Sequence, residues 1–152
     1  PPKPGGPIST VVEILQAKGE RIHTVSPSNT VLEAVRIMNE HRIGGLVVVG
    51  ESNKMVGLFT ERDLLTRVVG KGRQPETTTV AEVMTTEVVA CRPDTTLEAC
   101  ATTMTEKRIR HLPVEGPEGL MGIVTIGDLL AYRVQEQRAT IEQLTNFVYQ
   151  NR

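Results

Sequence analysis

Two short stretches of this sequence place a threonine three residues before an aspartate, directly after an apolar run. Thr60 and Asp63 follow MVGLF, and Thr125 and Asp128 follow LMGIV. At the start of a helix, this spacing lets the two side chains satisfy unpaired backbone N–H groups. A carboxylate beside the positive end of a helix dipole is also suited to accept hydrogen bonds from two neighbouring hydroxyls, such as the diol of a ribose. The spacing fits a helix cap alone and a cap that also binds ribose.

The two stretches belong to an internal repeat. Matching residues between positions 27 and 48 recur 66 positions later, and matching residues between positions 57 and 65 recur 65 positions later. In each copy, an apolar stripe at helical spacing is followed by two short β-rich runs, which predict a hairpin, and then by a second helix. The chain is therefore two copies of one unit with the order strand, helix, strand, strand, helix.

Helices are also expected outside the two copies. Capping-box spacing pairs Thr10 with Glu13, Thr30 with Glu33, Thr79 with Glu82 and Thr140 with Gln143. VAEVM, which follows Thr79, is expected to form one or two helical turns. The predicted organisation is a disordered or processed flank at 1–8, copy 1 with its leading helix at 9–70, a linker at 71–82, copy 2 at 83–134 and a C-terminal helix at 135–152.

Composition narrows the classes of function. The chain has 152 residues, a formal net charge of -1, two Phe, two Tyr and no Trp, so neither charge nor aromatic faces favour nucleic acid. No apolar run is long enough to span a membrane. Cys91 and Cys100 lack metal-ligand spacing and are expected to be small core residues in a reducing compartment, which is the cytoplasm or an organelle after removal of a targeting segment. The sequence contains no nucleophile elbow, Walker A or HExxH motif, and GKGRQP lacks the third glycine of a dinucleotide fingerprint, so we expect no enzyme.

The repeated pattern resembles the cystathionine β-synthase (CBS) domain over residues 18–134. The resemblance rests on a proline ahead of a helix ending in Met, then HRIGGLVVV or KRIRHLPVE, then Gly and Thr-x-x-Asp, all of them present twice. It implies an α+β fold of two tandem βαββα CBS repeats, a Bateman module, packed with pseudo-twofold symmetry and flanked by N- and C-terminal helices. Such modules usually bind adenosine-containing ligands in the clefts between the repeats.

The candidate site residues divide by chemistry. Leu58 and Ile123 provide aliphatic walls for a purine, beside the two Thr-x-x-Asp pairs. The resemblance assigns backbone contacts with the adenine edge to the segments that enter each copy, at Lys18, His23, Met84 and Val89. A lone histidine such as His23 is more often a surface or satisfied residue than a ligand group, and we expect His41 to be an exposed helix-end residue.

Phosphate donors differ between the copies. Arg110 and His111 stand where copy 1 has Gly44 and Gly45, and Arg62 precedes Asp63 where a glycine precedes the second aspartate. The resemblance implies that the basic pair lies near the centre of the cleft, where it would serve phosphate beside Asp63 across the pseudo-twofold axis, or a ligand in its own copy. The arginines alternatively are solvated or pair with carboxylates, and the glycines let the backbone approach its partner closely. We expect unequal affinities.

The sequence therefore predicts a non-catalytic regulatory module that binds AMP, ADP, ATP or NAD(H) and signals to a protein partner. We expect it to be a homodimer and expect neither nucleic acid nor a membrane as a partner. The alternative is a ligand-independent dimerisation or interaction module. An apolar stripe near the C-terminus suits a dimer contact, although packing on the protein's own core is the other interpretation; it comprises Ile141, Leu144, Phe147 and Val148.

Overall fold

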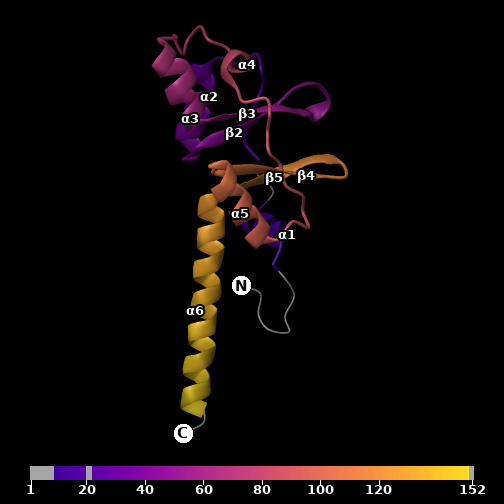
Figure 1. Ribbon diagram of the computed structural model, residues 1–152, viewed down its shortest axis with the longest axis vertical. Helices are drawn as coiled ribbons and strands as arrows, with labels where there is room; N and C mark the ends of the chain where they lie inside the picture. The colour runs from indigo at the N-terminus through magenta and orange to yellow at the C-terminus, as the bar shows by residue number, and fades with distance from the viewer. Residues whose placement is uncertain (1–8, 20–21, 151–152) are drawn as a thin grey trace.

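The computed structural model describes residues 9–19 and 22–150, so the predicted flank at 1–8 lies outside the described residues. Two small α/β units lie one above the other, and a long helix extends away from the lower unit (Figure 1). The α+β class, the two repeats and the flanking helices are confirmed. In chain order the elements are α1 (Val11–Lys18), β1 (Thr24–Val25), α2 (Val31–His41), β2 (Gly45–Val49), η1 (Glu51–Asn53), β3 (Met55–Thr60), α3 (Glu61–Asp63), η2 (Leu64–Val68), η3 (Val69–Lys71), α4 (Val80–Val83), α5 (Leu97–Lys107), β4 (His111–Gly116), β5 (Gly119–Thr125) and α6 (Ile126–Gln150).

The first copy is a three-stranded sheet with the order β1-β2-β3, in which β1 is parallel and β3 antiparallel to β2. Its helix α2 begins with the predicted capping box, because the Thr30 side chain accepts from the Glu33 N–H and the Glu33 carboxylate accepts from the Thr30 N–H. The antiparallel register places Gly45 opposite Thr60, so β3 delivers the first Thr-x-x-Asp pair to the same end of the sheet as the start of β2.

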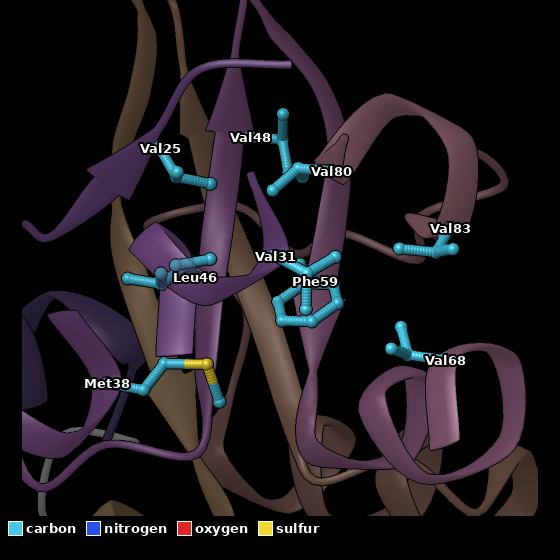
Figure 2. Close-up of a cluster of buried hydrophobic side chains, with 10 residues drawn as sticks. Val25, Val31, Met38, Leu46, Val48, Phe59, Val68, Val80 and Val83 are labelled. Carbon is cyan, nitrogen blue, oxygen red and sulfur yellow. The ribbon is translucent and has the colours of Figure 1, made fainter. Parts of the chain in front are cut away.

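The core of the first copy is completed by α4, which follows that copy in the chain. Val80 and Val83 of α4 are buried in one cluster with Val31 of α2 and Phe59 of β3 (Figure 2). Two backbone hydrogen bonds fix α4 against the start of α2. The Val80 N–H donates to the Asn29 carbonyl, and the Val31 N–H donates to the Thr78 carbonyl. VAEVM therefore forms the predicted helical turn, and this turn is part of a core.

The second copy has a two-stranded sheet, the β4-β5 hairpin, and its entering segment is reduced to a single parallel bridge between Cys91 and Val114. The reason is Pro113, which stands where the first copy has Val47. Proline has no N–H to donate to a neighbouring strand, so one ladder hydrogen bond of the first copy has no equivalent here. Cys91 and Cys100 are buried in this core as predicted, and their mutual hydrogen bond, with burial, raises the pKa of the Cys91 thiol.

The leading helix α1 packs against the second copy, although the sequence analysis grouped it with the first. Val11 and Ile14 are buried in one cluster with Cys100 and Leu112. The Val11 N–H donates to the Thr95 carbonyl at 3.0 Å, ahead of α5. Thr10 stands at the predicted N-cap, but its side chain makes no capping hydrogen bond. Each copy is thus completed by the helix that precedes the other copy in the chain. This helix is α4 for the first copy and α1 for the second.

The predicted C-terminal helix is present, but it does not begin as a separate element at residue 135. The second helix of copy 2 continues without a break to residue 150, as the single helix α6. Thr140 lies inside α6, and its hydroxyl donates to the Glu136 carbonyl at 3.0 Å, so it caps nothing. In copy 1 the corresponding helix ends because Gly70 and Gly72 follow, the latter with φ of +68°. Among the described residues, no helix combines the length and apolar composition needed to cross a membrane.

Candidate functional site

A cavity of about 380 Å³ lies between the two copies. Its wall combines the end of β3 with the turn into α3, the chain that follows α4, and the turn between α5 and β4. The volume falls within the range typical of small-molecule sites, about 300 to 1,000 Å³. The lining residues are Gly44, Leu58, Thr60, Glu61, Arg62, Asp63, Thr66, Arg67, Thr85, Glu87, Val88, Val89, Arg108, Ile109, Arg110 and His111.

Asp63 is a buried carboxylate in this wall, with a residue exposure of 4%. Its Oδ2 accepts from the Thr60 N–H at 3.0 Å and the Thr60 hydroxyl at 3.3 Å, so the helix-capping interpretation is confirmed. Its Oδ1 accepts from the Thr85 hydroxyl at 3.1 Å and lies 3.7 Å from Nε of Arg67. Because a carboxylate oxygen accepts about two hydrogen bonds, Oδ1 retains acceptor capacity toward the cavity.

Four arginines line the cavity, and among the described residues only one of them, Arg67, pairs with a carboxylate. Arg62 Nη1 donates to the Arg108 carbonyl at 3.3 Å and so links the first copy to the second. Arg67 Nη1 donates to the Met84 carbonyl at 2.9 Å. Arg110 is exposed at the cavity wall. Neither Arg62 nor Arg110 pairs with a carboxylate in the part of the chain that the structure describes, so their positive charge is available to an anion.

His111 enters the cavity wall from β4 and lies against the two glycines of copy 1. A Cβ on Gly45 would meet its ring at 3.1 Å, and a Cβ on Gly44 would lie 3.5 Å from its Nε2. The glycines therefore do permit the close approach that the sequence suggested. Burial lowers the pKa of His111 from its usual 6.5, against the opposing effect of Glu61, so the neutral imidazole is favoured.

The second Thr-x-x-Asp pair is built in the same way but has a different neighbour. Asp128 Oδ2 accepts from the Thr125 N–H at 2.9 Å, and the Asp128 N–H donates to the Thr125 hydroxyl at 3.1 Å. The Lys18 ammonium, at the end of α1, lies 2.8 Å from the same Oδ2 and donates to the Ile123 carbonyl at 2.9 Å. These four residues come together outside the cavity around Asp63.

Most of the fourteen candidate residues of the sequence analysis fall into two groups in the structure, and the other two, Met84 and His23, belong to neither group. Met84 packs on β3 with its sulfur 2.6 Å from where a Cβ on Gly57 would be. The half-buried His23 stacks on the exposed His41, with ring centroids 3.6 Å apart. The cavity gathers eight candidates, namely Gly44, Leu58, Thr60, Arg62, Asp63, Val89, Arg110 and His111. The second group is Lys18, Ile123, Thr125 and Asp128.

Sequence reasoning missed several cavity residues. Arg67 was detectable, because it stands four residues after Asp63 on the same helical face. Thr85 gave no local signal, since it reaches Asp63 only through the antiparallel bridge between Thr85 and Leu58. Among the described residues, no group of three or more His, Cys, Asp or Glu is placed to hold a metal ion.

Comparison with known proteins finds the CBS domain family twice, over residues 11–70 and 80–135. The chain is 33% identical over 148 residues to the mitochondrial CBS domain-containing protein CBSX3 of Arabidopsis thaliana, covering 92% of this chain and 72% of that protein. It is 37% identical over 131 residues to CBS domain-containing protein YhcV of Bacillus subtilis, covering 86% and 91%. The hexameric CBS-CP12 protein of bloom-forming cyanobacteria has a similar structure, with a TM-score of 0.71, 31% identity and coverage of 81% and 70%.

Proposed function

This chain belongs to the CBS-domain family as a tandem pair, and we propose that it is a non-catalytic regulatory module that binds an adenine nucleotide in the cavity beside Asp63. CBS-domain pairs are generally regulatory modules that bind adenosine ligands. The observation that carries the proposal is the position of Asp63, a buried carboxylate at a helix start that also lines a cavity of ligand size.

The cavity chemistry suits each part of such a ligand. Asp63 Oδ1 has one acceptor position left beside Thr85, and it accepts there from one hydroxyl of the ribose diol. Leu58 and Val89 supply apolar surface for the adenine ring, in a cavity whose described wall contains no aromatic side chain other than a histidine. Arg62 and Arg110 supply positive charge for phosphate from the two copies at once. AMP, ADP, ATP and NAD(H) all carry these three parts.

Signalling follows from the cavity's position between the copies. A ligand that contacts Asp63 on one side and Arg110 on the other favours one relative angle of the two units. It therefore shifts the population toward the surface that this angle offers to a protein partner. The Arg62 hydrogen bond to the Arg108 carbonyl is the existing link that the ligand would replace or strengthen.

The test is isothermal titration calorimetry and thermal unfolding with AMP, ADP, ATP, NAD and NADH, and with GTP as the unrelated base. A ligand at 100 times its dissociation constant stabilises by about 2.7 kcal/mol, which raises Tm by about 5 to 10 °C in a chain of this size. Asp63→Asn should remove most of this shift, because an amide replaces one acceptor oxygen. Asp94→Asn is the matched control, since Asp94 is exposed and lies outside the cavity. Wild-type binding by the Asp63 variant would refute the role given to that carboxylate.

A second candidate function, self-association, is favoured by α6. Its outer part is not packed on the protein's own core, because Ile141, Leu144 and Val148 are 63%, 61% and 57% exposed. Val134, Ile141 and Val148 recur every seven residues, and Leu130 and Leu144 take the intermediate position. β-Branched residues at one core position with leucine at the other favour a two-stranded coiled coil. We therefore propose that two copies pair through α6.

The dimer is tested by light scattering coupled to size-exclusion chromatography, with and without AMP. Ile141→Glu combined with Leu144→Glu should convert the dimer to a monomer, because a charge at a coiled-coil core position is buried without a partner. Gln143→Glu, on the outer face of the same turn, should not. A dimer that survives the double substitution excludes α6 as the interface. If the protein binds no nucleotide and its dimer does not depend on AMP, the result would favour the alternative function, a ligand-independent interaction module.

A further inference from the structure

The two Thr-x-x-Asp pairs differ in what occupies the space beside the carboxylate. Beside Asp63 that space is the cavity. Beside Asp128 it is the Lys18 ammonium, which contacts Oδ2 at 2.8 Å and the Ile123 carbonyl at 2.9 Å. The Lys18 and Asp128 side chains are 34% and 20% exposed, so the pair is accessible at the surface of the second unit.

The internal repeat shows why only one copy has this contact. The residue that corresponds to Lys18, 66 positions later, is Met84. The Met84 side chain lies flat on β3, with its sulfur 2.6 Å from a Cβ position on Gly57. On the equivalent Gly122 of β5, this packing position is taken by Leu15, whose Cδ2 lies 2.7 Å from the Cβ position. The side chain at the end of α1 is therefore not needed for packing, and its ammonium is directed to Asp128.

The positions that correspond to the phosphate donors are also glycines around the second aspartate. Gly127 stands where Arg62 precedes the first aspartate, and Gly44 and Gly45 stand where the other copy has Arg110 and His111. A nucleotide at Asp128 would have to displace a cation from the carboxylate, and glycine stands at the three positions that correspond to Arg62, Arg110 and His111. Both effects act in the same direction.

We infer that Lys18 occupies the diol-binding position of Asp128 and closes the second site, so that each chain binds one adenine nucleotide, at Asp63. This inference rests on the proposed function. Lys18 is then the residue that determines occupancy, through its ammonium and not through the backbone contact that the family resemblance assigned to it. Replacing the ammonium with an uncharged side chain of similar length opens the site.

The experiment measures stoichiometry by isothermal titration calorimetry with AMP, and with adenosine, which carries the diol without phosphate. Wild type is expected to bind one molecule per chain, and Lys18→Met, which copies Met84, two. Lys18→Arg keeps a cation and should still bind one. In an Asp63→Asn background, the wild-type lysine should leave no site and Lys18→Met one. Circular dichroism and urea unfolding verify that each variant is folded.

The outcomes separate the inference from the function on which it rests. Two molecules bound by wild type, or one bound by Lys18→Met, overturns the closed second site while adenine-nucleotide binding stands. No binding by wild type with one molecule bound by Lys18→Met refutes the site at Asp63 and supports the closure by Lys18. No binding by either protein refutes both.

Discussion

Adding one methyl group at Gly57 should have a different effect from adding it at Gly122, although the two glycines are equivalent in the repeat. Both are buried in the middle of a strand without a positive φ, so alanine suits their backbone. Restricting the unfolded chain in this way stabilises by about 0.4–1 kcal/mol. What decides the net effect is therefore the space around each new Cβ.

At Gly57 the new Cβ would lie 2.9 Å from the Thr85 carbonyl oxygen as well as 2.6 Å from the Met84 sulfur. The carbonyl is held in place, because it accepts from the Leu58 N–H at 2.9 Å. At Gly122 the close atoms belong only to the flexible end of Leu15, which is able to rotate away. Overpacking against fixed atoms costs about 1–3 kcal/mol. We expect Gly57→Ala to destabilise by about 1–2 kcal/mol and Gly122→Ala to change stability by less than about 0.5 kcal/mol.

Urea unfolding followed by circular dichroism measures both variants, with AMP titrations of the same samples. Gly57→Ala should also weaken AMP binding, because a displaced Thr85 moves its hydroxyl away from Asp63 Oδ1. Gly122→Ala should leave AMP binding unchanged. Equal destabilisation by the two variants, or a stabilised Gly57→Ala, would refute the argument that a fixed carbonyl makes the difference.

Two further predictions concern single side chains. Since burial lowers the pKa of His111 below 6.5, the unfolded chain binds more protons in the window just below that pH. The free energy of unfolding should therefore fall as the pH drops through this window, and urea titrations of His111→Gln should show a smaller fall; an unchanged slope would contradict it. Thr30→Ala should destabilise by about 1 kcal/mol in thermal unfolding, because it removes a helix cap. Thr140→Ala, within α6, should stay within about 0.5 kcal/mol of wild type. Comparable losses of stability in the two variants would mean that Thr140 does cap a helix.

The features that the sequence predicted well are those that depend on neighbouring residues. The caps at Thr30, Thr60 and Thr125 form through groups three residues apart, so spacing alone locates them. The same spacing misled at Thr140, because the signature also occurs by chance inside a helix. The absence of Gly and Pro between Asp128 and Thr140 is the signal that α6 continues.

The features that the sequence did not predict depend on tertiary contacts. An apolar stripe shows that α1 is buried on one side, but it does not show which copy covers it. The target of the Lys18 ammonium is 110 residues away, and no local pattern names it. Thr85 likewise joins the cavity only because a bridge places it beside Leu58. A repeat predicts that two equivalent sites exist. How the two sites differ depends on which side chain the segment ahead of each copy places beside the aspartate or on the sheet.

The contribution of α4 and α1 to the two cores has a consequence for how the protein folds during synthesis. The first core draws on one continuous stretch, from Val25 to Val83, so it is complete as soon as that stretch has left the ribosome. The second core needs Val11 and Ile14 together with residues as distant as Tyr132. The helix α1 is therefore made early and gains its partners last, after the first unit has folded. The unit that was duplicated in the sequence and the unit that folds are offset by one helix.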